Sequence, residues 1–205
     1  MNAFAAHGFP LLLASASPRR RELLSLLGVP FQIVPSSAEE EATGQGRDQV
    51  AAIARLKCDD VFVRNPNGFV LAADTLVCVG ESVLGKPDDP ADTARMLRLL
   101  SGRWHEVHTG VCLRGPGGST VSRVETTRVR FVPLSEEMID RYIRTGEPVD
   151  KAGAYAIQGV GGIFISRIDG SPSNVMGLPL SAVSEMLADA GFSVLSGMDL
   201  STIEA

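Results

Sequence analysis

Short apolar runs and longer periodic segments alternate along the chain, with breaks rich in Gly, Pro and Ser between them. The apolar runs predict strands near residues 11–14, 31–34, 69–73 and 76–79. Apolar positions at helical spacing predict helices near 18–27, 47–63, 90–100, 135–145 and 180–190. The early alternation of the two kinds of element is typical of a sheet covered by helices.

The second half of the chain has a different pattern. Gly115–Gly118 predicts the turn of a hairpin between strands near 106–113 and 121–132. Short strands are also expected near 154–157 and 163–168, on either side of a Gly-rich turn. Helices alternating with strands, followed by a long hairpin, favour an α/β or α+β fold with a mixed sheet.

Composition narrows the class of protein. The chain has 205 residues, of which 44% are hydrophobic, and a formal net charge of −5. This balance argues against a protein that coats nucleic acid, although it leaves room for a local basic pocket. Three widely spaced cysteines indicate reduced thiols, no apolar run is long enough to cross a membrane, and the N-terminus makes a poor signal peptide. We therefore expect a cytoplasmic protein that uses neither a membrane nor a nucleic-acid polymer.

The segment 15–21, SASPRRR, is the strongest local signal for a ligand. Ser17 suits a helix N-cap and Pro18 the first helical position, which places Arg19–Arg21 in the first turn. Each arginine there opposes the helix dipole by about 0.3–1 kcal/mol. A bound anion such as phosphate would offset that cost, whereas the alternative is an ordinary capped helix with surface arginines.

Asp74 interrupts an apolar run and is the second candidate. It follows Phe69–Ala73, so it is expected to end a strand, where carboxylates in α/β folds often line a ligand crevice. A turn or capping role is the alternative. The acidic run Glu39–Glu41 follows the second predicted strand and is either a solvated surface or a partner of Asp74 in holding a hard divalent cation.

Two other motifs do not fit the chemistry that they suggest. Gly80–Pro87 nearly matches a P-loop, but Pro87 stands where a hydroxyl is needed for Mg²⁺. His105 and His108 are one residue too close for a helical zinc motif, and in a strand they would lie on different faces. Lys86 is retained as a single candidate for phosphate contact.

Taken together, several short motifs resemble a known family. They are SASPRR at 15–20, ELL at 22–24, AADT at 72–75, GKP at 85–87, LSGRWH at 100–105, DKAGAYAIQG at 150–159, IDG at 168–170 and VMGLPL at 175–180. In this order they resemble the Maf family of nucleoside triphosphate pyrophosphatases over about 10–190. We expect one domain over 10–192 and a C-terminal tail over 193–205.

The resemblance implies an α/β, ITPase-like (Maf/Ham1) fold, with an elongated mixed sheet flanked by helices and two lobes around a nucleotide cleft. It implies Mg²⁺- or Mn²⁺-dependent hydrolysis of a nucleoside triphosphate to the monophosphate and pyrophosphate, and a homodimer. The chain is similar to the branch that acts on dTTP and UTP. Because the family has also been linked to septum formation, a nucleotide-binding regulator of cell division with little catalysis is the alternative function.

The resemblance also assigns roles to individual residues. It implies phosphate binding by Ser15, Arg19, Arg20, Lys57 and Lys86. It implies metal binding by Glu40 and Asp74, with Asp74 also catalytic, and base selection by Arg19, Thr75 and Gln158. Ala156 departs from the more usual glycine of this segment.

Overall fold

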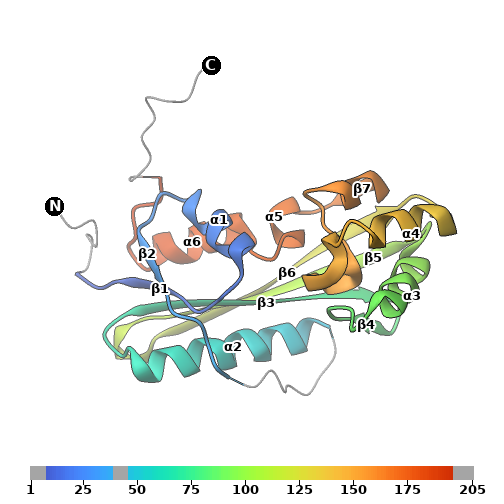
Figure 1. The fold of residues 1–205 in the computed structure, drawn as a ribbon. Coiled ribbons are helices and arrows are strands. Elements are labelled where there is room, and N and C mark those ends of the chain that lie inside the picture. Colours follow the sequence, from blue (N-terminus) through green and yellow to red (C-terminus); the bar gives the residue numbers. More distant parts are fainter. Residues whose placement is uncertain (1–7, 39–45, 196–205) are drawn as a thin grey trace.

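The computed structural model describes residues 8–38 and 46–195. Its central element is a mixed β-sheet that includes three long strands (Figure 1). The sheet order is β2-β1-β3-β5-β6-β7, and β4 pairs with β3 outside this path. The strands are β1 (Leu11–Leu13), β2 (Phe31–Ile33), β3 (Phe69–Val79), β4 (Ser82–Leu84), β5 (Trp104–Arg114), β6 (Thr120–Phe131) and β7 (Ile165–Asp169).

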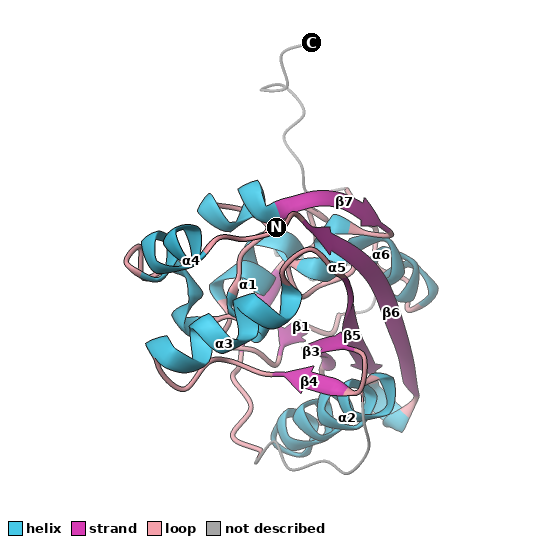
Figure 2. Cartoon of the chain, turned by 90° about the vertical axis from the view of Figure 1, so that its right-hand side faces the viewer, coloured by secondary structure: helices cyan, strands magenta, loops and turns pink. Residues whose placement is uncertain are grey.

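Helices lie on both faces of this sheet (Figures 1 and 2). They are α1 (Pro18–Ser25), α2 (Arg47–Arg64), α3 (Pro90–Leu100), α4 (Glu136–Ile143), α5 (Pro172–Val175) and α6 (Leu180–Asp189). Four short 3-10 segments join them: η1 (Pro116–Gly118), η2 (Glu147–Asp150), η3 (Ala152–Ala154) and η4 (Val160–Phe164). The α/β fold with an elongated mixed sheet, expected from the sequence, is confirmed.

Strand β3 runs without a break through the position of Asp74. The expectation of two strands, with Asp74 ending the first, is therefore wrong. Asp74 lies opposite Gly110 and Thr75 opposite Thr109 in the antiparallel ladder with β5. This ladder continues to satisfy the backbone of β3 across the polar residues, so a charged side chain does not end the strand.

The other edge of β3 is covered only at its two ends. Strand β1 pairs with residues 69–71 and β4 pairs with residues 77–79. Both lie on the edge that β5 leaves free, and within the described part of the chain no strand pairs with residues 72–76 on that side. Asp74 and Thr75 thus lie at a gap in the sheet edge.

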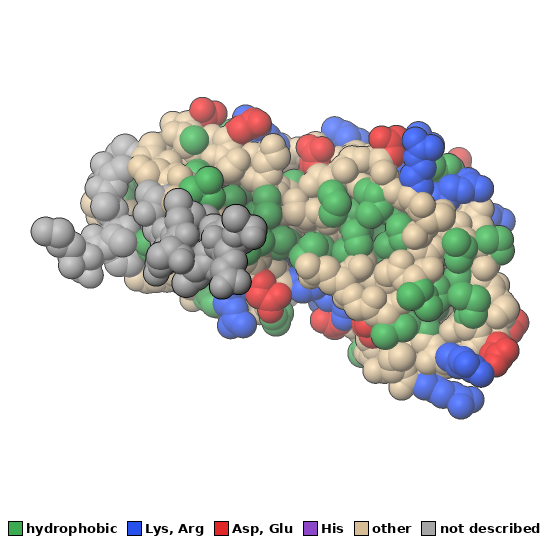
Figure 3. Space-filling view, turned by 90° about the horizontal axis from the view of Figure 1, so that it is seen from above, with side chains coloured by type: hydrophobic (Ala, Val, Ile, Leu, Met, Phe, Trp, Pro, Cys, Tyr) green, Lys and Arg blue, Asp and Glu red, His purple; other side chains and the backbone are tan. Residues whose placement is uncertain are grey.

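Three buried apolar clusters surround β3. One joins β1, α1 and α6 around Leu71 and Ala73 and forms the first lobe. Another joins β4, α3 and α4 around Val77 and Val79 and forms the second lobe. The third packs α2 against the opposite face of the sheet. Seen from above, the surface narrows between the two lobes (Figure 3), so the gap in the sheet edge lies where the lobes meet.

Most remaining sequence expectations agree with the structure, but one strand was wrongly expected and two short elements, β4 and α5, were not predicted. The hairpin of β5 and β6 turns through η1, as expected. The strand expected near 154–157 is wrong: the chain there follows η3, and the Ala156 amide donates to the Tyr142 hydroxyl at 3.1 Å instead of to a strand. Strand β4 was missed because its three residues are flanked by glycines and polar residues.

None of the helices in the described ranges combines the length and the apolar character needed to cross a membrane.

Gly110 allows α2 to approach β5, and replacing it tests this packing. A Cβ at position 110 would lie 2.5 Å from the carbonyl carbon of Val50 on α2. We expect Gly110→Ala to lower the free energy of unfolding by about 3 kcal/mol, because backbone must move on one side or the other. Urea denaturation measures this change. Gly85→Ala, at a site with no atom within 4 Å of the added carbon, is the control; equal losses in both variants would contradict the packing argument.

Candidate active site

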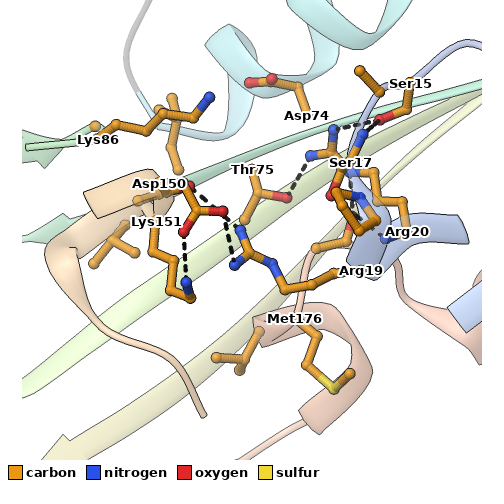
Figure 4. Close-up of a pocket in the computed structure, with 18 of the residues that line it drawn as sticks. Ser15, Ser17, Arg19, Arg20, Asp74, Thr75, Lys86, Asp150, Lys151 and Met176 are labelled. Atoms are coloured by element: carbon orange, nitrogen blue, oxygen red, sulfur yellow. Dashed lines mark hydrogen bonds and ion pairs between the residues drawn. The ribbon is translucent and has the colours of Figure 1, made fainter. Parts of the chain in front are cut away.

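A cavity of about 620 Å³ lies over the gap in the edge of β3 (Figure 4). Its wall includes the loop before α1 and the first turn of that helix, α2, the middle of β3, the GKP segment after β4, and the segment 150–158. The cavity therefore lies between the two lobes and draws on both. Of the candidate residues named from the sequence, it brings together Ser15, Arg19, Arg20, Lys57, Asp74, Thr75, Lys86 and Gln158.

Helix α1 begins as expected. The Ser17 hydroxyl accepts from the Arg20 amide at 3.5 Å, and Pro18 is the first helical residue. Arg19 and Arg20 line the cavity, while Arg21 is exposed and is not among its lining residues. The first turn thus brings two of its three arginines to the cavity.

Arg20 is held by hydrogen bonds from three sides. Its Nε donates to the Gly177 carbonyl at 2.9 Å, and its Nη1 donates to the Ser15 hydroxyl at 3.4 Å. Its Nη2 donates to the Thr75 hydroxyl at 3.1 Å. These bonds fix the planar guanidinium at the cavity wall, so its position is set before any ligand arrives.

Arg19 reaches across to the segment that begins at Asp150. Its Nη1 lies 3.6 Å from the Asp150 carboxylate, whose other oxygen lies 2.5 Å from Lys151 Nζ. The hydrogen bond from Lys151 and the charge of Arg19 lower the pKa of Asp150 despite some burial. The two lobes are therefore bridged by an aspartate between two cations, a contact that the sequence did not reveal.

Lys57 and Asp74 form a buried ion pair. Lys57 Nζ lies 2.8 Å from Asp74 Oδ1, and the two residues are only 9% and 6% exposed. Alternation along β3 places the side chain of Asp74 toward α2, which carries Lys57. The pair joins the two candidates that the sequence had placed on separate elements.

Thr75 belongs to a chain of hydrogen bonds that runs into the protein. Its hydroxyl lies 3.0 Å from that of Thr109 on β5, and the Thr109 hydroxyl donates to the Asn174 carbonyl at 3.1 Å. Thr109 and Asn174 are both fully buried. Neither Thr109 nor Asn174 was named as a candidate from the sequence, because a threonine inside an apolar strand carries no local signal.

Gln158 is exposed at the cavity wall, and the segment that carries it is anchored on both sides. Ala156 donates to the Tyr142 hydroxyl, which in turn donates to the Glu147 carboxylate at 2.8 Å. The amides of Val160 and Gly161 both donate to Glu147 at 2.9 Å. Burial raises the pKa of Glu147, but these hydrogen bonds outweigh it and the net pKa is lowered. The carboxylate stays charged and holds the loop.

Lys86 and Glu40 are the two remaining candidates from the sequence. Lys86 is exposed at the cavity wall beyond β4, and Figure 4 shows its ammonium reaching into the space that Asp74 also borders. Glu40 lies outside the described residues. Within the described ranges no three His, Cys, Asp or Glu side chains come together closely enough to hold a metal ion by themselves.

The two motifs rejected from the sequence do not form a P-loop or a helical zinc motif in the structure. Residues 80–87 form a turn, β4 and a loop instead of leading directly into a helix, since α3 begins only at Pro90. His105 is hydrogen-bonded to Tyr155 and His108 to Thr126. Burial lowers the pKa of His105 to about 4.

Comparison with known proteins gives consistent results. The family model described as Maf-like protein matches residues 10–190. A protein of Thermococcus gammatolerans named dTTP/UTP pyrophosphatase is 48% identical over 186 residues, which cover 91% of this chain and 99% of the relative. A protein of the same name from Anaeromyxobacter dehalogenans is 50% identical over 187 residues, covering 89% and 94%.

Solved structures that resemble the chain are much more distant in sequence. The Staphylococcus aureus Ham1 protein aligns with a TM-score of 0.51 at 12% identity, covering 88% of this chain and 99% of that chain. A HAM1 protein from Coxiella burnetii gives a TM-score of 0.50 at 15% identity, covering 88% and 99%. These likenesses support the fold and nothing further.

The buried ion pair predicts an unusual pattern of stabilities. Lys57→Met should lower the free energy of unfolding by about 3 kcal/mol, because it leaves a buried carboxylate without its ammonium partner. Adding Asp74→Asn to that variant should restore about 1–2 kcal/mol, since the uncompensated charge is then removed. Chemical denaturation of the single and double variants measures both changes.

The exposed pair of Arg141 and Glu137, with side chains 77% and 72% exposed, supplies the control. Arg141→Met should change stability little, because solvent screens such a pair. A double variant no more stable than Lys57→Met alone would contradict the proposed coupling of Lys57 and Asp74.

Proposed function

Because this chain belongs to the Maf-like protein family, we propose that it hydrolyses dTTP and UTP to the nucleoside monophosphate and pyrophosphate. The observation that carries this proposal is the buried Asp74 carboxylate in a cavity that is also lined by four cations, Arg19, Arg20, Lys57 and Lys86. The names of the relatives that are about half identical over nearly the whole chain support the same activity.

The cations serve to bind the triphosphate. Arg20 is already oriented by the Gly177 carbonyl and the Ser15 hydroxyl, and its position in the first turn of α1 places it near the free amides of that helix. Arg19 and Lys86 approach from opposite sides of the cavity (Figure 4). Together they would neutralise the phosphate chain, which makes pyrophosphate a better leaving group.

Asp74 would act as the general base. Water attacks the α-phosphorus, a new P–O bond forms, and the bond to the oxygen that bridges the α- and β-phosphates breaks. Asp74 accepts the proton of the attacking water, and pyrophosphate leaves with the electron pair of the broken bond. Lys57 holds one carboxylate oxygen at 2.8 Å and thereby orients the other.

A divalent cation, Mg²⁺ or Mn²⁺, is part of this proposal. Mg²⁺ in phosphate-handling sites is usually held by one or two carboxylates together with substrate phosphate oxygens. Asp74 fits that donor set as a hard oxygen ligand, and Glu40 would be the second one. When bound, such an ion supplies charge stabilisation and activates water.

Base selection would fall to Arg19, Thr75 and Gln158. The Gln158 amide both donates and accepts hydrogen bonds, as does the edge of uracil or thymine, which carries an N–H between two carbonyls. A different base edge would leave polar groups unpaired in the site, which is the physical basis for discrimination.

Product analysis of the purified protein tests the reaction. With Mg²⁺ or Mn²⁺ and a panel of dTTP, UTP, CTP, ATP, GTP and 7-methyl-GTP, we expect pyrophosphate and the monophosphate from dTTP and UTP. Asp74→Asn should lower kcat by about 100-fold or more while the fold is retained, because the proton acceptor is lost.

Asp140→Asn, which removes one exposed carboxylate on α4, is the charge-matched control and should keep full activity. Release of inorganic phosphate instead of pyrophosphate would refute the proposed reaction. Nucleotide binding without turnover would favour the regulator.

Gln158→Ala tests base selection separately. We expect the ratio of kcat/KM for dTTP to that for CTP to fall by about tenfold, with a smaller loss in kcat for dTTP, because the lost amide contacts the base and not the phosphates. Val160→Ala alters an exposed side chain two residues further along the same loop and serves as the control. An unchanged ratio in Gln158→Ala would remove Gln158 from the base-reading residues.

A further inference from the structure

The buried residue Thr109 lies one hydrogen bond behind the proposed base-reading residue Thr75. Thr109 is 0% exposed and is not among the residues that line the cavity, so it does not touch a bound nucleotide. Its hydroxyl nevertheless lies 3.0 Å from the Thr75 hydroxyl, which is at the cavity wall. Thr109 can therefore act on the base only through Thr75.

Each hydroxyl has one proton to donate, which restricts how this chain is arranged. The Thr109 hydroxyl donates to the Asn174 carbonyl at 3.1 Å, so its proton is not available to Thr75. The contact between the two hydroxyls must then be a bond donated by Thr75 to Thr109. The Thr75 hydroxyl therefore donates its only proton to Thr109 and has none to donate to a ligand in the cavity.

Arg20 favours the same direction. Its Nη2 donates to the Thr75 oxygen at 3.1 Å, which occupies one of the two lone pairs of that oxygen. A hydroxyl that accepts a bond from a cation is a stronger donor in turn, so the bonds from Arg20 through Thr75 to Thr109 reinforce one another. What Thr75 still offers to the cavity is one lone pair and no proton.

If the hydrogen bond between the two hydroxyls ran from Thr109 to Thr75, Thr75 would offer a donor to the cavity instead of an acceptor. If Thr109 donated to Thr75, the Thr75 oxygen would accept from both Arg20 and Thr109, and its proton would point to the cavity. The Asn174 carbonyl would then lose the bond from the Thr109 hydroxyl and keep its backbone bonds, such as the one from the Gly177 amide at 2.9 Å. A carbonyl accepts a hydrogen bond more strongly than a hydroxyl does. The favoured arrangement is therefore the one in which Thr75 donates to Thr109 and Thr109 donates to the Asn174 carbonyl.

We propose that Thr109 is a positioning residue for base selection, because it fixes Thr75 as a hydrogen-bond acceptor. This inference rests on the proposed function. Uracil and thymine carry a proton on N3, which the free lone pair of Thr75 accepts. Cytosine has a lone pair and no proton at N3. Its N3 and the Thr75 oxygen would then both be acceptors, and no hydrogen bond could form unless the bonds through Thr75 and Thr109 reversed direction. The buried chain therefore selects uracil and thymine over cytosine.

Paired substitutions at position 109 test this role. Thr109→Val has the same shape but no acceptor for the Thr75 proton, so Thr75 becomes free to donate to cytosine N3. We expect the ratio of kcat/KM for UTP to that for CTP to fall by about tenfold, mostly through a lower KM for CTP, with kcat for UTP changed much less. Thr109→Ser keeps the hydroxyl and should retain the ratio of the unmodified protein.

Thr127→Val provides the control for loosened packing. Thr127 is also fully buried, and its hydroxyl bonds to Asn174 Nδ2 at 3.0 Å without reaching Thr75. It should leave the UTP to CTP ratio unchanged even if stability falls. A ratio unchanged in Thr109→Val, or lowered equally in Thr127→Val, would overturn the proposed role of Thr109.

Equilibrium binding separates this inference from the proposed reaction. The dissociation constants of UTP and CTP are measured for the Asp74→Asn protein with and without Thr109→Val, where no turnover is needed. A preference for UTP that Thr109→Val abolishes supports the role of Thr109, whichever products the active enzyme forms. Equal binding of both nucleotides before the Thr109 change would overturn that role and leave the hydrolysis itself standing.

Discussion

The arrangement of this protein depends on strand β3, which is longer than β1 and β4, the two strands that pair with one of its edges. Strand β3 pairs with β5 along nearly its whole length, while β1 and β4 cover only the two ends of its other edge. Each end of the strand is buried in a separate apolar cluster, so β3 is common to both lobes. The uncovered middle lies between the lobes, and polar residues can stand there because β5 satisfies the backbone from the opposite side.

Alternation along this strand separates two kinds of chemistry. Asp74 faces α2 and meets Lys57, whereas Thr75 faces the opposite side of the sheet and meets Arg20 and Thr109. Adjacent residues thus serve the proposed proton transfer and the proposed base selection without sharing partners. Three of the cations that line the cavity already bind protein oxygens: Arg19 binds Asp150, Lys57 binds Asp74, and Arg20 binds neutral oxygens. An arriving triphosphate would compete for them.

The sequence predicted those features that depend on local physics. Ser17 and Pro18 define the start of α1, and the turn at Gly115–Gly118 defines a hairpin, because capping and turn formation involve only neighbouring residues. It did not predict that β3 continues through Asp74, since that depends on pairing with β5, where the partner of Asp74 is Gly110. Thr109 could not be singled out for the same reason, since its proposed role comes from two hydrogen-bond partners on other elements, Thr75 and Asn174.

The placement of polar groups also accounts for the proposed discrimination between bases in a cavity that holds several cations. Lysine and arginine attract the phosphates of any nucleoside triphosphate, so contacts to phosphate supply little selectivity among bases. Discrimination needs groups whose donor or acceptor character is fixed, and a hydroxyl exposed to solvent is not fixed because its proton rotates. Tying the Thr75 proton to a fully buried neighbour removes that freedom. The residues proposed to contact phosphate line the cavity, while the residue that would set selectivity lies in the core, where solvent cannot replace a lost hydrogen bond.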